Sequence, residues 1–187
     1  LVQMNSRSDK TANLAVAEQL VTEAVQQGAQ LVALPEYVNF LGPRELHDAN
    51  AEPIPGPTTE RFAALARRLG IYLLGGSILE RSEIPGKFYN TSVLYGPDGS
   101  ILAIYRKIHL FDVDLTGNVT SNESATILPG DRIVTAEVAG HTVGLTICYD
   151  LRFPELYRLL ALAGAELILV PAAFTLYTGK DHWHVLL

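Results

Sequence analysis

Hydrophobic residues at the start of the chain follow first a helical and then a strand-like pattern. Apolar positions recur at helical spacing between Asn13 and Val25, and Gly28 ends the pattern, so a helix is predicted here. The apolar run over 31–34 predicts a buried strand that a proline stops. Residues 1–4 are predicted to form a further strand.

A loop rich in proline and glycine leads to a second predicted helix. Thr58 is expected to cap this helix and Gly70 to end it, because the apolar residues between them share one face. The apolar residues over 71–79 predict a single strand after the helix.

A hairpin is predicted in the middle of the chain. The strand-like runs 89–95 and 100–105 flank the tight-turn sequence Gly-Pro-Asp-Gly, and the second run ends at Lys107. The segment 114–124, with several small polar residues, is predicted to be a loop.

A second hairpin precedes a helix and a strand. The hairpin is predicted to join 133–138 to 142–147, with Cys148 at its far end. Pro154 suits the first turn of the helix that follows, and 167–170 is a buried strand. Hairpins combined with strand–helix–strand units predict an α/β or α+β fold whose apolar strands are covered on both faces.

Length and composition indicate one globular domain. The chain has 187 residues, of which 48% are hydrophobic and 18% charged, which is enough to bury one substantial core. We therefore expect a single domain over residues 1–187. Since the chain stops within what looks like a young helix, we expect the C-terminal part of this domain to be missing.

Charge, apolar runs and cysteine content limit the partners and the cellular setting that we expect. The net charge is −6 and the basic residues are scattered, so we expect no nucleic acid partner. No apolar stretch approaches the roughly 18 residues of a membrane helix, so we expect a soluble protein. A single cysteine cannot form an internal disulfide, which favours a cytoplasmic setting.

Three reactive side chains each lie at or just past the end of a predicted strand, namely Glu36, Lys107 and Cys148. Because ligands of layered α/β proteins bind at that edge of the strands, a carboxylate, an ammonium and a thiol could meet there. Each residue alone also has an ordinary interpretation: a solvated loop carboxylate, a surface lysine and a small buried hydrophobe.

The sequence around the cysteine favours the catalytic interpretation. Residues 147–155, Ile-Cys-Tyr-Asp-Leu-Arg-Phe-Pro-Glu, place the thiol on a sharp strand-to-helix connection, where backbone N–H groups are free to face a ligand. A thiol must ionise to attack. A carboxylate can accept its proton, and a nearby ammonium favours the anion.

Three blocks of the sequence resemble the signature blocks of the nitrilase, or carbon-nitrogen hydrolase, superfamily in the right order. They are Leu-Pro-Glu-Tyr at 34–37, Tyr-Arg-Lys-Ile-His-Leu-Phe-Asp at 105–112 and Cys-Tyr-Asp-Leu-Arg-Phe-Pro-Glu at 148–155. Within the superfamily the chain looks closest to the Nit branch of deaminated glutathione amidases and omega-amidases. The resemblance implies a four-layer αββα sandwich. It also implies a homodimer or larger homo-oligomer formed through the helix after the cysteine, where Leu156, Leu159 and Leu160 are available.

The resemblance further implies a cysteine-dependent amidase that acts on the terminal amide of a small carboxylate-bearing molecule. Glu36 would be the general base and Cys148 the nucleophile that forms a thioester. Lys107 and the backbone N–H of Tyr149 would stabilise the oxyanion. Glu123 matches a second glutamate of the family that orients the lysine or the substrate, and an ordinary loop carboxylate is its alternative role. Neither a metal nor an organic cofactor is required.

Substrate contacts are predicted less directly. Arg152 offers the geometry to bind a substrate carboxylate, but an ion pair with Asp150 or Glu155 is an alternative role. His182 either borders the pocket, as the resemblance implies, or packs in the core. Neighbourhood in the sequence suggests three pocket-wall residues, Tyr37, Phe111 and Phe174.

Two other functions remain compatible with the sequence. The substrate could be a carbamoyl amide or a nitrile, although the Tyr-Asp that follows the cysteine favours an amidase. The chain could also be a non-catalytic binding domain with the same fold.

Overall fold

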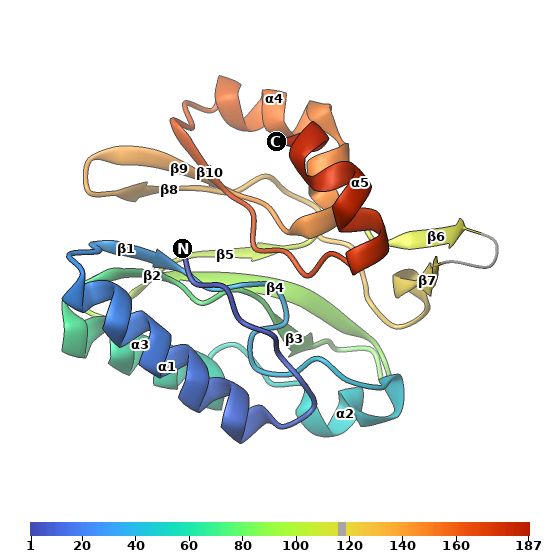
Figure 1. Ribbon diagram of the computed structural model, residues 1–187, viewed down its shortest axis with the longest axis horizontal. Coiled ribbons are helices and arrows are strands. Elements are labelled where there is room, and N and C mark those ends of the chain that lie inside the picture. The colour runs from blue at the N-terminus through green and yellow to red at the C-terminus, as the bar shows by residue number, and fades with distance from the viewer. Residues whose placement is uncertain (116–118) are drawn as a thin grey trace.

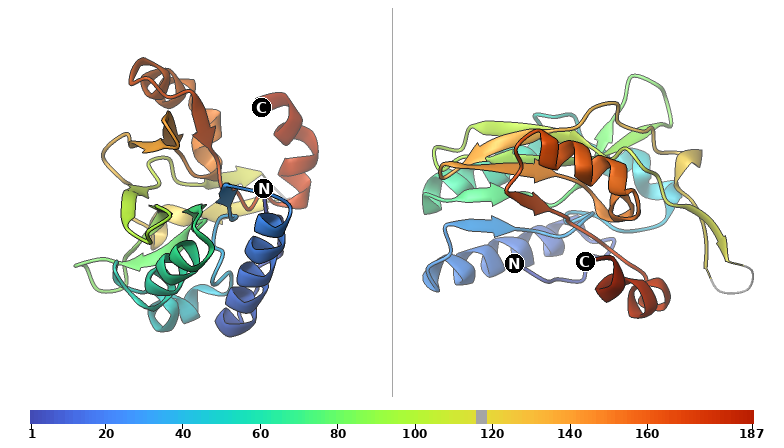
Figure 2. Two further views of the ribbon diagram at one scale, coloured as in Figure 1. Left: turned by 90° about the vertical axis from the view of Figure 1, so that its left-hand side faces the viewer. Right: turned by 90° about the horizontal axis from the view of Figure 1, so that it is seen from above.

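The computed structural model describes residues 1–115 and 119–187 and arranges them in four layers, as the resemblance predicted (Figure 1). Two helices cover one sheet, this sheet faces a second one, and a further helix covers the outer face of the second sheet (Figure 2). The α-helices are α1 (Lys10–Gln26), α2 (His47–Asn50), α3 (Pro57–Leu69), α4 (Pro154–Leu162) and α5 (Leu176–Leu186). The 3₁₀ turns are η1 (Arg44–Leu46), η2 (Glu123–Ala125) and η3 (Cys148–Arg152).

The strands form two facing sheets and a separate hairpin. The first sheet has the order β1-β2-β4-β3, with β5 on the other side of β4; the second has the order β10-β9-β8, and β6 pairs with β7. The strand bounds are β1 (Leu31–Ala33), β2 (Tyr72–Leu74), β3 (Ile78–Arg81), β4 (Phe88–Tyr95), β5 (Ile101–Arg106), β6 (Asp112–Leu115), β7 (Val119–Asn122), β8 (Thr135–Val138), β9 (His141–Leu145) and β10 (Leu167–Leu169).

Two apolar cores hold the layers together. The buried faces of α1 and α3 pack on β1, β2 and β4 through residues such as Val21, Phe62 and Leu73. The second core lies between the sheets, where Leu94 and Tyr105 meet the apolar residues of β8, β9 and β10. Apolar burial of this kind is the main driving force for stacking the layers.

Most predicted elements are confirmed, and the differences have local causes. The segment 1–4 is not a strand; its backbone hydrogen bond from Val2 N to the Ala33 carbonyl, 3.1 Å, is too little for a ladder. Thr58 does not cap α3. The helix begins at Pro57, and the Thr58 hydroxyl and N–H are instead taken up by the buried Glu52 carboxylate.

The predicted loop 114–124 contains the end of β6 and the whole of β7, which pair from Asp112 with Asn122 onward. Short polar strands carry little apolar periodicity, which is why the pattern missed them. Residues 116–118 of that loop lie outside the described part of the chain.

The predicted single strand over 71–79 is two strands separated by a bend. Both β2 and β3 pair with β4, but the register shifts by one residue between Leu74, opposite Leu94, and Ile78, opposite Thr91. Gly76 within the bend has φ +63°, and a Cβ there would lie 2.0 Å from the Pro35 carbonyl oxygen. Because glycine has no Cβ, Pro35, in the segment after β1, can lie directly against the bend.

Among the described residues, none of the helices combines the length and the apolar character that crossing a membrane requires.

Replacement of Gly76 by alanine is expected to destabilise the fold through two separate effects. The left-handed backbone costs a non-glycine residue about 1–2 kcal/mol, and the clash with Pro35 adds an overpacking cost of about 1–3 kcal/mol. Urea unfolding measures the total loss in the free energy of unfolding. Gly70→Ala is the control, because Gly70 has φ +65° but open space around its Cβ position. Equal losses in the two variants would contradict the clash.

Candidate active site

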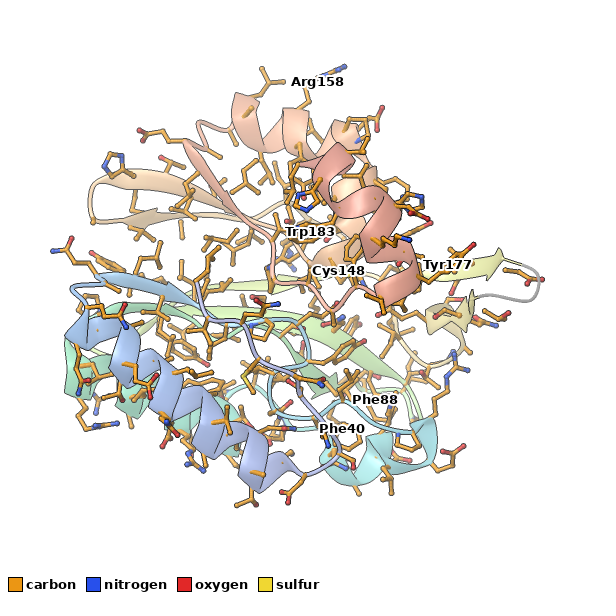
Figure 3. All side chains as sticks on the ribbon, in the orientation of Figure 1. Phe40, Phe88, Cys148, Arg158, Tyr177 and Trp183 are labelled. Carbon is orange, nitrogen blue, oxygen red and sulfur yellow. The ribbon has the colours of Figure 1, made fainter. Side chains whose placement is uncertain are left out.

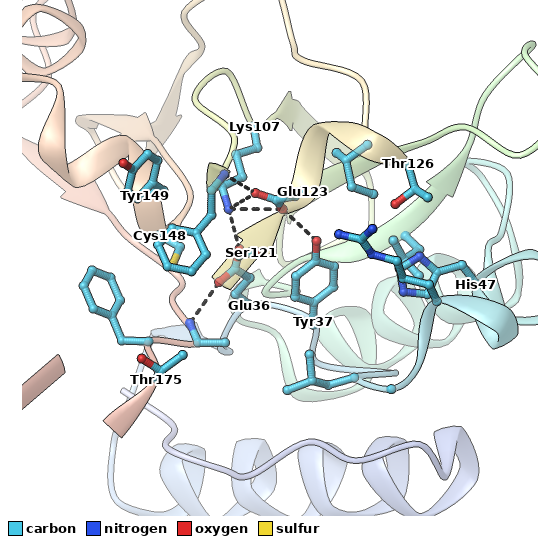
Figure 4. Close-up of a pocket in the computed structure, with 18 of the residues that line it drawn as sticks. Glu36, Tyr37, His47, Lys107, Ser121, Glu123, Thr126, Cys148, Tyr149 and Thr175 are labelled. Carbon is cyan, nitrogen blue, oxygen red and sulfur yellow. Dashed lines mark hydrogen bonds and ion pairs between the residues drawn. The ribbon is translucent and has the colours of Figure 1, made fainter. Parts of the chain in front are cut away.

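Ends of strands from both sheets deliver the three predicted reactive residues to one pocket. Glu36 follows β1, Lys107 comes directly after β5, and Cys148 begins η3 shortly after β9. All three line the pocket shown in Figure 4. Figure 3 shows Cys148 in the interior of the molecule, whereas Arg158 projects from the outer side of α4. The structure thus brings together the carboxylate, the ammonium and the thiol.

The Lys107 ammonium is the centre of a buried ion network. Its Nζ lies 3.0 Å from Glu36 Oε1 and 3.0 Å from Glu123 Oε2, and only 2% of the side chain is exposed. Burial alone would lower the pKa of Lys107. The charges of Glu36 and Glu123 outweigh that effect and raise the pKa above its usual value, so the lysine is a cation at neutral pH.

Each glutamate is fixed by further donors. Glu36 Oε2 accepts a hydrogen bond from Ala173 N at 2.9 Å. Glu123 accepts hydrogen bonds from Phe111 N at 2.7 Å and from the Tyr37 hydroxyl at 2.9 Å. Glu123 is therefore positioned beside Lys107, where the resemblance placed it.

Asn90 is a site residue that the sequence did not reveal. It lies in β4, and its Nδ2 donates to Glu36 Oε1 at 2.9 Å and to Glu123 Oε1 at 3.4 Å. The Lys107 N–H donates to the Asn90 carbonyl at 2.9 Å, so the two residues lie side by side. The available signal was the run of three polar residues, 90–92, between the apolar ends of this strand, because a buried amide requires partners.

The backbone is strained at Cys148 and at Tyr37, the residue that follows Glu36. Cys148 has φ +47° and Tyr37 has φ +53°, a region that few non-glycine residues adopt. Such conformations persist when the surroundings fix them, and they cluster at functional sites. The Tyr37 N–H donates to Ser77 Oγ at 3.0 Å, so the bend between β2 and β3 supports this segment.

The thiol is held in its protonated form. Burial raises the pKa of Cys148 most, and the Glu36 charge raises it further, while Lys107 opposes both. Burial likewise raises the pKa of Tyr37, with Glu123 and Glu36 adding to the effect. The resting site therefore holds a neutral thiol and a neutral phenol around a charged lysine.

The pocket has a volume of about 250 Å³ and mixed walls. Tyr37, Phe111 and Phe174 line it, as predicted, and so do Arg152 and the ring of Tyr149, which was predicted only as a backbone donor. The sequence did not identify other parts of its wall, because η1, α2, β7 and the residue after η2 show no apolar period. These parts include Arg44, His47, Ser121 and Thr126.

Arg152 does not form the alternative ion pair with an acidic neighbour. In the described part of the chain neither Asp150 nor Glu155 bonds to it, since other donors occupy the Asp150 carboxylate. Instead Arg152 Nη2 lies 2.8 Å from His182 Nδ1. Arginine only donates, so this nitrogen of His182 is the acceptor. His182 therefore contacts Arg152 and is not itself among the described residues that line the pocket.

A metal site was not expected. Within residues 1–115 and 119–187, no cluster of histidine, cysteine and acidic side chains is arranged to hold a metal ion.

The chain matches one protein family over its whole length and covers about two thirds of its relatives. The profile of the carbon-nitrogen hydrolase family matches residues 1–187. The human omega-amidase NIT2 is 45% identical to the chain over 186 residues, which are 100% of this chain and 67% of that protein. The mouse omega-amidase NIT2 is 46% identical with the same coverage. The chain thus spans about two thirds of the length of these relatives.

Solved structures agree with this result. The chain superposes on Nit3 of Saccharomyces cerevisiae, a member of branch 10 of the nitrilase superfamily, with a TM-score of 0.87 and 35% identity, covering 100% of this chain and 68% of that one. An amidase from Nesterenkonia sp. AN1, with acrylamide added at its active-site cysteine, gives a TM-score of 0.79 at 28% identity, covering 96% and 68%. The chain therefore belongs to the carbon-nitrogen hydrolase family, as its three sequence blocks predicted.

Proposed function

We propose that this site hydrolyses the terminal amide of a small carboxylate-bearing molecule through a thioester on Cys148. The observation that carries the proposal is the contact of the buried Lys107 ammonium with both Glu36 and Glu123 in the pocket that Cys148 lines. Amidase relatives and the family match support the reaction class.

In the first half-reaction, Glu36 accepts the thiol proton as sulfur attacks the amide carbon. Negative charge moves to the carbonyl oxygen, where the Lys107 ammonium stabilises it. Tyr149 is near the start of η3, where N–H groups have no partner within the helical turn, so its N–H is a second donor. Collapse of the intermediate breaks the C–N bond, and Glu36 returns the proton to the departing ammonia.

In the second half-reaction, Glu36 takes a proton from water, whose oxygen attacks the thioester carbon. The same donors stabilise the second oxyanion. The C–S bond then breaks, the thiolate regains the proton and the carboxylic acid leaves. Glu123 keeps Lys107 charged and in place, because its carboxylate is one of the two that raise the pKa of Lys107.

The substrate class rests on Arg152. Its guanidinium lies at the pocket wall, 5.6 Å from the centre of the Tyr149 ring and 5.8 Å from that of Phe174, and His182 fixes its orientation. A fixed guanidinium suits a carboxylate at the far end of a short linear amide. Candidates are 2-oxoglutaramate, succinamate and deaminated glutathione.

Incubation of the full-length protein with these three amides is expected to release ammonia. Cys148→Ala should abolish release with little change in melting temperature, because it removes one atom. Lys107→Ala should lower kcat by about 10²–10³, the effect of losing an oxyanion donor. Ammonia assays and thermal melts measure both. Carbon dioxide released with the ammonia would indicate a carbamoyl substrate, and absence of release from every small amide would contradict the proposal.

The thiol of Glu36→Gln is expected to ionise at lower pH than that of the wild type. Glu36 raises the pKa of Cys148, so loss of its charge lets the thiolate form sooner. Only the thiolate reacts with iodoacetamide, so the rate of Cys148 alkylation should rise at lower pH. Glu52→Gln is the control, because this buried carboxylate bonds to Lys10 and Thr58 and lies outside the pocket. If the pH midpoint of alkylation stayed the same or moved to higher pH in Glu36→Gln, the proposed effect of Glu36 on the thiol would be excluded.

Arg152→Met is expected to lower kcat/KM for succinamate by about 10- to 100-fold, because a charge-assisted hydrogen bond contributes about 1.5–3 kcal/mol. Hydrolysis of propanamide, which has no carboxylate, should change little. His182→Ala keeps the guanidinium but frees it, so a smaller loss of the same kind is expected. Steady-state kinetics with both amides measures these changes. Equal losses of kcat/KM for the two substrates would show that Arg152 does not bind the carboxylate.

We also propose that the full-length protein forms a homodimer or larger homo-oligomer through α4. The apolar surface that α4 offers to a second copy differs from the expected one. Leu156 and Leu160 are buried within the chain itself, whereas Leu159 and Leu162 are exposed. Leu162 is 80% exposed, so Leu162→Glu should leave the fold intact and reduce the assembly mass in sedimentation equilibrium. An unchanged mass would place the contact elsewhere.

A further inference from the structure

The Asp150 carboxylate is fully buried and has four donors. Tyr105 Oη donates to Oδ2 at 2.7 Å and Ile147 N at 2.9 Å. His109 donates twice to Oδ1, from its backbone N at 2.9 Å and from Nδ1 at 2.8 Å. An ionised carboxylate offers about four acceptor positions, so every position is occupied. Asp150 is not one of the described residues that line the pocket.

The donors come from the two segments that carry the reacting groups. Tyr105 and His109 lie two residues before and two residues after Lys107. Ile147 directly precedes Cys148, and Asp150 itself follows it by two residues. One carboxylate thus bonds to both sides of the lysine and closes the turn that holds the cysteine.

His109 strengthens this connection by a second contact. Its ring stacks on that of Phe153, with centroids 3.7 Å apart and planes 9° apart. Phe153 belongs to the same connection between Cys148 and α4, so His109 holds this connection through both a hydrogen bond and a stack. The Cys148 backbone, at φ +47°, requires such external support.

We propose that Asp150 is a positioning residue that sets the distance between the Lys107 ammonium and the Cys148 sulfur. The inference deepens the proposed function, since it takes those two groups as the reacting pair. Asp150 touches neither of them. It acts through Tyr105, His109 and Ile147, and its loss displaces the lysine-bearing and cysteine-bearing segments relative to one another.

Asp150→Asn in the full-length protein tests the inference. The amide oxygen keeps two acceptor positions, while its NH₂ faces groups that also donate. A displacement of about 1 Å at a reacting centre lowers the rate by up to about 100-fold. We therefore expect kcat to fall by about 10- to 100-fold with little change in KM, because the walls that bind the substrate remain.

Glu52→Gln is the matched control. Glu52 is also a buried carboxylate, and it accepts bonds from Lys10 Nζ at 2.6 Å, Thr58 N at 2.6 Å and Thr58 Oγ1 at 2.7 Å. None of these partners lines the pocket. The control should lower the melting temperature and leave kcat per folded molecule unchanged. An equal fall of kcat in both variants would reduce Asp150 to a structural role and overturn the proposal.

His109 variants keep the test decisive if Asp150→Asn does not fold. His109→Asn retains an N–H near the position of Nδ1, whereas His109→Ala removes it. The proposal expects the asparagine variant to recover a large part of the kcat lost in the alanine variant. Equal kcat values in the two variants would contradict it.

A substrate-free measurement separates this inference from the proposed function. Lys107 lowers the pKa of Cys148, so its displacement should move the pH midpoint of alkylation by iodoacetamide upward in Asp150→Asn and leave it unchanged in Glu52→Gln. An unchanged or lowered midpoint in Asp150→Asn would overturn the positioning role. If the wild type releases no ammonia but the midpoint moves as expected, the positioning role stands and the proposed amidase substrate fails.

Discussion

The burial of one ammonium group constrains the whole site. A lysine that is almost fully removed from water loses its hydration, and this loss is large unless anionic and polar partners replace it. Lys107 obtains them from Glu36 and Glu123, which are 71 and 16 residues away in the chain. The fold must therefore bring the end of β1, the end of β5 and the turn η2 to one point.

The four-layer arrangement meets this constraint because its strands end at the same edge. Apolar cores on both faces of the first sheet fix β1, β4 and β5, and the register of β4 with β5 sets Asn90 beside Lys107. The bend at Gly76 lets the Glu36 segment approach without a clash. Packing far from the pocket thus determines the distances within it, which gives a common physical basis to stability and to the proposed chemistry.

Charge distribution makes the site suitable for a neutral nucleophile that is activated only during reaction. Burial and the Glu36 carboxylate raise the pKa of Cys148, and the Lys107 ammonium offsets them only in part. A free thiolate is therefore suppressed at rest. Glu36, the proposed acceptor of the thiol proton, belongs to the ion network of Lys107. Attack by sulfur and transfer of the proton are therefore coupled in the proposed mechanism.

The sequence by itself determined the reactive residue types, the three family blocks and most of the regular elements, such as α1, α3 and the two hairpins. It also determined the layer order, because the resemblance implied it. Only the tertiary structure decided that Asn90 joins the two glutamates and that His182 rather than an acid holds Arg152. It also decided that Asp150 links the segments around Lys107 and Cys148. Most of these bonds join residues far apart in the chain through specific rotamers and strand registers. Local periodicity carries no information about either, because it reports only which face of an element is buried.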